Sequence, residues 1–231
     1  MGKDVIIACD FSSKAQVLEF LDKFEGKKPF VKIGMELFYA EGPSIVKDIK
    51  DRGHEIFLDL KLHDIPNTVK KSMSVLKNLD VDLCNLHASG GSKMMKAAIE
   101  GLTREDGTRP LLIAVTQLTS TDLDMMNNEL GIDGSIENTV MSYAKNAADS
   151  GLDGVVCSPL EAEKVHEVCG DKFLTVTPGI RFADGDIGDQ VRIMTPEKAK
   201  NISDYIVVGR PITAAPDPVA AYERCVAEFV G

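Results

Sequence analysis

The sequence lacks the features that mark several large classes of protein. Its 231 residues contain no run of five or more basic residues, and the formal net charge is −10. Binding to duplex nucleic acid requires a basic surface that neutralises phosphates, so this composition argues against a nucleic-acid partner. A small anionic substrate is compatible with the net charge, because a few local Lys and Arg side chains can dominate the potential within one cleft.

Paired cysteines and long apolar segments are lacking as well. The five cysteines are Cys9, Cys84, Cys157, Cys169 and Cys225, and no C-x-x-C motif occurs. An odd number of widely spaced cysteines predicts buried free thiols in a reducing compartment. The apolar run from Val5 to Cys9 is too short for a signal sequence or a membrane span. We therefore expect a cytoplasmic protein without a membrane partner.

The motifs of common metal and dinucleotide sites are missing too. No H-x-x-x-H or H-E-x-x-H pattern occurs, so we expect no metal site and interpret His63 and His87 as structural histidines. No G-x-G-x-x-G follows the first predicted strand, which argues against a doubly wound open sheet. Because no Pro/Ser-rich linker or low-complexity segment divides the chain, we expect one domain over residues 1–231.

The pattern that is present is a regular alternation of short β-type runs with amphipathic helical segments. The predicted strands span residues 5–9, 30–33, 56–60, 83–86, 111–115, 154–157, 174–176 and 206–208. In the helical segment after the third strand, Val69, Met73 and Leu76 mark one apolar face. Eight strands, each followed by a helical segment, predict an α/β protein with a closed (β/α)8 TIM barrel.

Two long connections follow the fifth and seventh predicted strands, at residues 117–135 and 178–195. Loops that follow strands lie on the catalytic face of a (β/α)8 barrel, and long loops in a compact domain commonly act as lids. We therefore expect both connections to cover the active site.

The most informative stretch is residues 57–68, in which Asp59 and Lys61 alternate with leucines and Asp64 follows within one short turn. In a β-strand this alternation places the carboxylate and the ammonium on one face and the leucines on the other, under a covering layer of helices. Charged side chains seldom lie inside a protein unless they are paired. We therefore interpret these three residues as part of a reaction centre.

Charged residues gather at the ends of the first three predicted strands and in the turn after the third. They are Asp10, Lys32, Asp59, Lys61 and Asp64. Taken singly, Asp10 could cap the first helix in competition with Ser12, and Lys32 could extend to solvent. Asp64 taken alone is interpreted as the N-cap of a helix that begins near Pro66. Their gathering on one rim of a barrel nevertheless predicts a catalytic array.

The last two strand ends carry residues suited to an anion. Gly209 and Arg210 follow the eighth predicted strand, and Arg181 and Gln190 lie in the loop after the seventh. In (β/α)8 enzymes a phosphate commonly binds between these two loops, at the start of a short helix. Glycine lets the backbone approach the phosphate closely, and arginine supplies two parallel donors. These residues predict an enzyme that acts on a phosphorylated small molecule.

Four blocks of sequence carry a wider similarity. They are residues 59–68 (DLKLHDIPNT), 115–120 (VTQLTS), 177–181 (TPGIR) and 208–213 (VGRPIT). Together they resemble the signature of the orotidine 5′-phosphate decarboxylase family, in its bacterial branch, within a similarity that extends from Ile6 to about Ala221. Phe182 departs from the family pattern, in which a proline follows the arginine. The resemblance implies a barrel of the ribulose-phosphate-binding type.

The resemblance also implies a reaction and a set of roles. The reaction is the decarboxylation of orotidine 5′-monophosphate to uridine 5′-monophosphate (UMP) and CO2, the last step of de novo pyrimidine biosynthesis, without metal or organic cofactor. Lys61 would donate the proton, in a catalytic array with Lys32, Asp59 and Asp64. The implied substrate-binding residues are Asp10, Lys32, Asp59, Ile65, Thr68, Thr119, Pro178, Arg181, Gln190, Gly209 and Arg210. Asp64 and Thr68 would act across the interface of a homodimer.

Two alternatives to this enzyme are considered. Mg²⁺-dependent sugar-phosphate decarboxylases and aldolases of the same superfamily use a similar Asp-x-Lys-x-x-Asp motif, but residues 65–68 and 116–120 argue against them. A non-catalytic phosphate-binding barrel is the second alternative. The crowded carboxylates around Lys61 argue against it, because a protein that only binds phosphate gains nothing from them.

Overall fold

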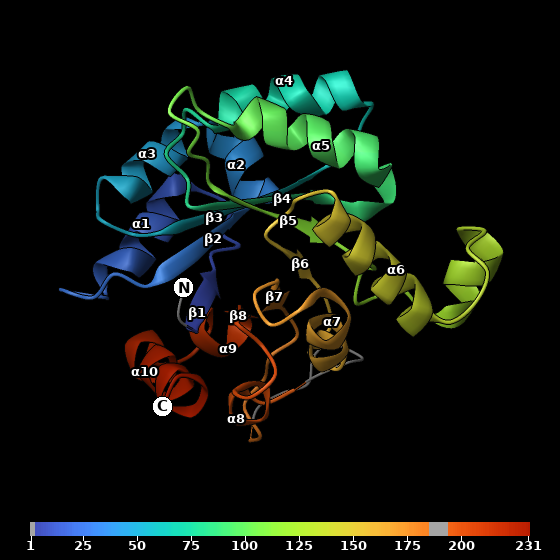
Figure 1. Ribbon diagram of the computed structural model, residues 1–231. Coiled ribbons are helices and arrows are strands. Elements are labelled where there is room, and N and C mark those ends of the chain that lie inside the picture. The colour runs from blue at the N-terminus through green and yellow to red at the C-terminus, as the bar shows by residue number, and fades with distance from the viewer. Residues whose placement is uncertain (1–2, 185–193) are drawn as a thin grey trace.

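The computed structural model describes residues 3–184 and 194–231. Its parallel strands pair in sequence order and close into a barrel (Figure 1). The strands are β1 (Asp4–Ala8), β2 (Phe30–Gly34), β3 (Ile56–Leu62), β4 (Leu83–His87), β5 (Leu111–Val115), β6 (Gly154–Val156), β7 (Leu174–Thr177) and β8 (Tyr205–Val208). Each predicted strand overlaps an observed one, with bounds that differ by at most two residues at either end, so the predicted (β/α)8 barrel is confirmed.

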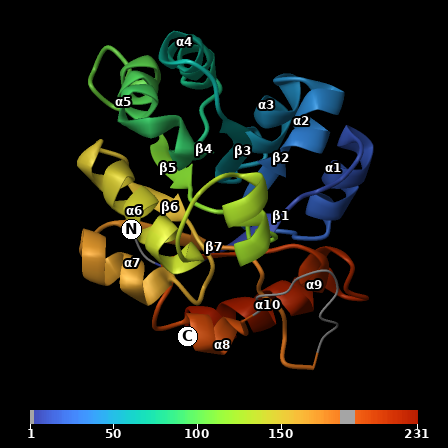
Figure 2. The ribbon, with the colours of Figure 1, turned by 90° about the vertical axis from the view of Figure 1, so that its right-hand side faces the viewer.

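Helices surround the barrel on its outer side (Figure 2). They are α1 (Lys14–Asp22), α2 (Met35–Glu41), α3 (Ser44–Lys50), α4 (Pro66–Leu76), α5 (Gly91–Leu102), α6 (Ile136–Asp149), α7 (Ala162–Cys169), α8 (Pro196–Ala199), α9 (Arg210–Thr213) and α10 (Pro218–Phe229). Two short helical turns are η1 (Ala88–Gly90) and η2 (Met125–Glu129). The predicted apolar face of α4 is confirmed, because Val69, Met73 and Leu76 are its buried residues.

The start of α1 corrects one expectation. Its N-cap is Ser13, whose extended backbone directs the hydroxyl oxygen to the N–H of Gln16. Ser12 instead donates its hydroxyl proton to the side chain of Gln16, and Asp10 accepts a hydrogen bond from Lys32. Neither Asp10 nor Ser12 therefore caps the helix.

The connection between β5 and α6 is partly helical. Residues 117–135 contain η2, which Asp122 supports by accepting a hydrogen bond from the N–H of Met125 at 2.8 Å. This segment projects beyond α6 in Figure 1 (yellow-green, at the right) and lies toward the viewer in Figure 2. It follows a strand, so it belongs to the end of the barrel where catalytic residues of this fold lie.

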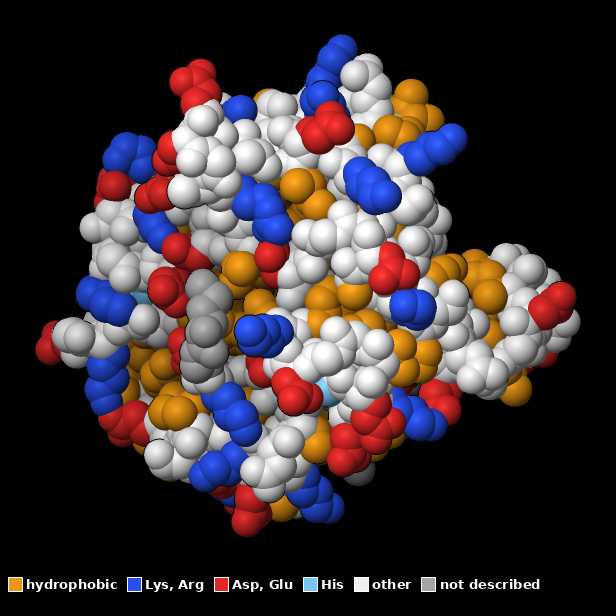
Figure 3. All heavy atoms as spheres, viewed as in Figure 1, with side chains coloured by type: hydrophobic (Ala, Val, Ile, Leu, Met, Phe, Trp, Pro, Cys, Tyr) orange, Lys and Arg blue, Asp and Glu red, His pale blue; other side chains and the backbone are white. Residues whose placement is uncertain are grey.

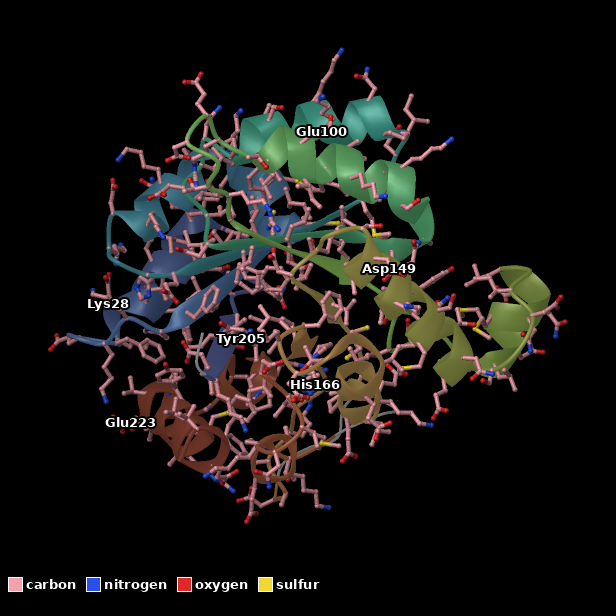
Figure 4. The ribbon with its side chains drawn as sticks, viewed as in Figure 1. Lys28, Glu100, Asp149, His166, Tyr205 and Glu223 are labelled. Carbon is pink, nitrogen blue, oxygen red and sulfur yellow. The ribbon has the colours of Figure 1, made fainter. Side chains whose placement is uncertain are left out.

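Two apolar layers form the core. Inside the barrel Ile6, Phe57 and Tyr205 pack together, and Figure 4 labels Tyr205 near the centre of the molecule. Their chain neighbours Ile7 and Leu58 belong to the layer between the strands and the helices. Because successive side chains along a strand point to opposite faces, each strand supplies both layers. The carboxyl ends of the strands are left for polar side chains.

The outer surface is charged and of mixed sign. Lys, Arg, Asp and Glu side chains are interspersed over the face shown in Figure 3. Lys70 of α4 and Glu100 of α5, the latter labelled at the surface in Figure 4, form an ion pair of 2.6 Å. Exposed pairs of this kind add little stability, so apolar packing holds the helices on the barrel. Within residues 3–184 and 194–231, none of the helices has the length and apolar character of a membrane span.

Candidate active site

A chain of ion pairs crosses the carboxyl ends of β1, β2 and β3. Nζ of Lys32 lies 2.9 Å from Oδ1 of Asp10 and 3.3 Å from Oδ2 of Asp59. Nζ of Lys61 lies 2.6 Å from Oδ1 of Asp59. The fold thus joins residues from three separate strands into one array, in which carboxylates alternate with ammonium groups.

Lys32 and Asp59 are buried, yet both are held in their charged forms. Burial alone would lower the pKa of Lys32, but the charges of Asp59 and Asp10 outweigh it and raise that pKa above its usual value. Burial alone would raise the pKa of Asp59, but the charges of Lys32 and Lys61 and the hydrogen bonds to the carboxylate lower it. Opposite charges in a low-dielectric interior thus keep Lys32 and Asp59 ionised at neutral pH.

The backbone at Lys61 departs from regular strand geometry. Its φ is 52°, in the left-handed region that residues other than glycine seldom adopt. The pairing of β3 with β4 also shifts here, because Leu58 pairs with Cys84 while Leu62 pairs with Leu86. Four steps along β3 match two along β4, so β3 carries two extra residues at this point. The strict alternation expected from the sequence is therefore interrupted, and a bulge directs the lysine side chain.

Asn85 of β4 lies opposite this bulge and forms hydrogen bonds with both Lys61 and Asp59. Its Oδ1 accepts a hydrogen bond from the backbone N–H of Lys61 at 2.8 Å. Its Nδ2 donates to Oδ1 of Asp59 at 2.7 Å. The resemblance assigns Asn85 no role. The signal in the sequence is its position, because it is a polar residue within the apolar run of β4 near the carboxyl end.

A cavity of about 160 Å³ opens beside the array. One part of its wall is charged and the rest is largely apolar, which suits a flat ring with polar edges. Thr119 and Pro178, both predicted to bind substrate, line the cavity. The lining residues are Lys32, Phe57, Asp59, Lys61, Asn85, Val115, Gln117, Leu118, Thr119, Val156, Cys157, Pro178 and Val207.

Residues 63–68 form an exposed rim next to the array. The N-cap of α4 is Ile65, and no side chain caps this helix, so the interpretation of Asp64 as an N-cap is wrong. Asp64 accepts a hydrogen bond only one residue away, from the N–H of Ile65 at 2.6 Å, because the chain is extended at Ile65. Thr68 is exposed on the same rim. Within the described part of this single chain, no ion pair joins Asp64 to Lys61.

Three of the residues predicted to bind phosphate, Arg181, Gly209 and Arg210, lie around the ends of β7 and β8. Gly209 is the N-cap of the short helix α9, and Arg210 is its first residue, as the sequence predicts. Arg181 is buried, and its Nη1 donates to the carbonyl of Ile180 at 2.8 Å. Gln190 lies outside the described residues.

Histidines lie near the array without forming a metal centre. Among residues 3–184 and 194–231, no group of three or more His, Cys, Asp or Glu side chains is arranged to hold an ion. The rings of His63 and His87 lie side by side, with centroids 5.7 Å apart. Burial, followed by the charges of His63 and Lys61, lowers the pKa of His87 and favours its neutral form.

A second cavity, of about 530 Å³, opens at the opposite end of the barrel. Its lining includes Asp4, Glu55, Arg109 and Tyr205, which lie at or before the first residues of their strands. In (β/α)8 barrels the amino ends of the strands support stability, whereas the carboxyl ends carry the chemistry. The smaller cavity beside Lys61 is therefore the candidate active site.

Comparison with known proteins agrees with this geometry. The model of the orotidine 5′-phosphate decarboxylase / HUMPS family matches residues 3–225. Orotidine 5′-phosphate decarboxylases of Bacillus cytotoxicus and Bacillus mycoides are each 57% identical over 235 residues, which cover 100% of this chain and 99% of the relative. The crystal structure of orotidine 5′-phosphate decarboxylase from Lactobacillus acidophilus matches with a TM-score of 0.89 and 46% identity, covering 99% of this chain and 100% of that one. The chain therefore belongs to the orotidine 5′-phosphate decarboxylase / HUMPS family.

Proposed function

We propose that this chain decarboxylates orotidine 5′-monophosphate to UMP and CO2, the last step of de novo pyrimidine biosynthesis, without a metal or organic cofactor. The observation that carries the proposal is the chain of ion pairs from Asp10 through Lys32 and Asp59 to Lys61, at the wall of a narrow cavity. The family of the chain and the names of its relatives support the same reaction.

Lys61 is the proton donor in this mechanism. When the bond between C6 and the carboxylate breaks, its electron pair stays on C6, in the plane of the pyrimidine ring, where the π system does not delocalise it. A fixed ammonium group next to C6 stabilises that charge and then transfers its proton to form the new C–H bond. CO2 leaves, and Lys61 regains a proton from solvent before the next turnover.

Asp59 and Lys32 hold Nζ of Lys61 in place through their ion pairs. The Asp59 carboxylate lies 2.6 Å from Nζ of Lys61 and forms an ion pair with it. Lys32 in turn helps to keep Asp59 ionised in spite of its burial. Because these charges are oriented before substrate binds, little reorganisation is needed when negative charge develops on C6.

The other predicted residues each bind one part of the substrate. We assign the phosphate to Arg181, Gln190, Gly209 and Arg210, the pyrimidine to Thr119, the ribose hydroxyls to Asp10 and Thr68, and flanking contacts to Ile65 and Pro178. The phosphate is remote from the bond that breaks. Its binding energy can therefore be used to close the loops over the site and exclude water.

We further propose a homodimer in which Asp64 and Thr68 of one subunit complete the active site of the other. Both residues lie on the exposed rim of residues 63–68. Ile65, between them, is 67% exposed, and an apolar side chain set among polar groups is typical of a protein interface. A single domain over residues 1–231 and a cytoplasmic location complete the proposal.

The test is a spectroscopic assay of the purified protein with orotidine 5′-monophosphate in the presence of EDTA. A change of the ultraviolet spectrum to that of UMP would support the proposal, including its independence of metal. No change, followed by turnover of a sugar phosphate once Mg²⁺ is restored, would assign the chain to the metal-dependent relatives. Binding of UMP without turnover of any of these substrates would indicate a non-catalytic barrel.

A further inference from the structure

The bulge in β3 leaves the proposed proton donor without regular strand support. Across the bulge, four steps of β3 lie opposite two steps of β4, and Lys61 has φ of 52°. In a regular parallel sheet the backbone groups of β4 would pair with this part of β3. Here the hydrogen bond from the N–H of Lys61 goes to a side chain, that of Asn85.

Asn85 is buried, and its amide is held by two hydrogen bonds. The residue is 1% exposed, and the two polar atoms of its side chain both form hydrogen bonds within the array. The orientation of the amide is determined by its partners. The Asp59 carboxylate accepts hydrogen bonds only, so the NH2 group must face it, and the Lys61 N–H donates only, so the carbonyl oxygen must face that group. The opposite orientation would bring like polar groups together at both contacts.

We propose that Asn85 is a positioning residue, which holds the left-handed backbone of Lys61 and the carboxylate of Asp59 in one fixed arrangement. The inference rests on the proposed function, in which Lys61 donates the proton. Without this clamp, Lys61 would relax toward ordinary strand geometry, because a left-handed backbone persists only where its surroundings hold it. Its Nζ would then move relative to C6 of the substrate.

The side chain of asparagine suits this place for a chemical reason. The site needs one donor for a carboxylate and one acceptor for a backbone N–H, on one short side chain. Leucine has a similar size but would leave both groups unpaired in a buried place. Aspartate supplies both functions only when protonated, and once ionised it would repel Asp59.

The experiment compares Asn85→Leu with the control Thr175→Val. Thr175 is a fair match, because it is fully buried in β7, donates to Oδ2 of Asp204 at 3.1 Å and accepts from the N–H of Asp204 at 3.2 Å. We expect Asn85→Leu to lower kcat by about 10²-fold with little change in KM, since a displacement of roughly 1 Å at a reacting group has that effect. We expect Thr175→Val to retain the kcat of the unmodified enzyme. Unchanged kcat in Asn85→Leu, or an equal loss in both variants, would overturn the proposal.

A second variant, Asn85→Asp, is tested through the pH dependence of kcat, which a purely structural role of Asn85 would not change. When the introduced carboxyl group is protonated it can donate to Asp59 and accept from the N–H of Lys61. Its kcat should therefore fall as pH rises through the pKa of that group, which burial near Asp59 raises. The unmodified enzyme should lack this step. A pH profile equal to that of the unmodified enzyme would overturn the proposal, even if Asn85→Leu does not fold.

A third measurement separates this proposal from the proposed function. Hydrogen exchange of the Lys61 amide, followed by NMR, reports the hydrogen bond to Asn85 without any substrate. We expect this amide to exchange faster in Asn85→Leu, whose side chain offers no acceptor for the Lys61 N–H, than in the unmodified protein. If the unmodified protein does not turn over orotidine 5′-monophosphate, the proposed function fails, while the exchange rate still tests the clamp. If Asn85→Leu leaves the exchange rate of the Lys61 amide unchanged, the positioning role of Asn85 is refuted.

Discussion

Nζ of Lys61 lies 2.6 Å from Oδ1 of Asp59, a residue that precedes it by two positions in the same strand. The contact depends on a left-handed backbone at Lys61, with φ of 52°. Such a conformation costs on the order of 1–3 kcal/mol for a residue other than glycine. The ion pair and the hydrogen bonds of Asn85 offset this cost. Backbone strain of this kind is typical of active sites, where the arrangement of reacting groups matters as well as stability.

Replacement of the proposed proton donor should abolish turnover without abolishing binding. In Lys61→Ala we expect kcat to fall by about 10³-fold or more, because both the stabilising charge and the proton are lost. Binding of UMP should stay measurable by calorimetry, since the phosphate and ribose contacts lie elsewhere. Lys145→Ala, which breaks only an exposed pair with Asp149 on α6, is the control and should behave normally. Robust turnover by Lys61→Ala would rule out Lys61 as the acid.

The stability contributed by Asp59 should depend on pH in a defined direction. Its pKa in the folded protein is lowered, so its contribution is present above the unfolded-state pKa of about 4 and is lost as pH falls through the folded-state value. We expect Asp59→Asn to lower the free energy of unfolding by about 1–3 kcal/mol at neutral pH. Urea denaturation at several pH values should show this difference shrinking in acid. A difference independent of pH would contradict the charged state assigned to Asp59.

Gly34, the last residue of β2, lies so close to the array that a side chain there would contact it. A Cβ atom there would lie 3.0 Å from Oδ1 of Asp10 and 3.2 Å from Nζ of Lys32. We expect Gly34→Ala to displace both groups by a few tenths of an ångström and to lower kcat/KM by about 10-fold. The melting temperature, measured by calorimetry, should change little, since the contacts are with flexible side-chain ends. Normal kcat/KM would show that the array tolerates this displacement.

The role of Arg210 can be separated from general damage by comparing two substrates. We expect Arg210→Ala to lower kcat/KM for orotidine 5′-monophosphate by about 10²-fold or more, because a two-pronged contact to phosphate is lost. The slow reaction of orotidine, which has no phosphate, should be unaffected. Arg52→Ala, at the surface pair with Asp22, is the control and should leave both reactions unchanged. Equal losses with both substrates would remove Arg210 from phosphate binding.

The shared active site of the proposed dimer predicts complementation. Lys61→Ala and Asp64→Asn should each be nearly inactive alone. After the two variants are mixed and subunits exchange, about a quarter of all sites should contain both native residues, because a twofold dimer places one intact site in each mixed pair. Steady-state assays of the mixture should recover activity to about that level. No recovery after proven subunit exchange would show that Asp64 acts within its own subunit or not at all.

Several elements could be predicted because their determinants are local. The strands were recognisable as short apolar runs, and the face of α4 followed from Val69, Met73 and Leu76 at helical spacing. The caps were less predictable. Several polar residues compete near the start of α1, and Ser13, not Asp10 or Ser12, has the backbone geometry of an N-cap. At α4 the extended backbone at Ile65 leaves the helix without a side-chain cap.

By itself the sequence determined the barrel, the polar ends of its strands and the charges of the array. The physical reason is that strand alternation and the high cost of an unpaired buried charge act within a few residues. Only the tertiary structure decided how Lys61 meets Asp59. The bulge arises where β3 pairs with β4, and the side chain that supports it, Asn85, lies 24 residues from Lys61 along the chain. A register between two strands depends on closing the whole barrel, so no local pattern around Lys61 could specify it.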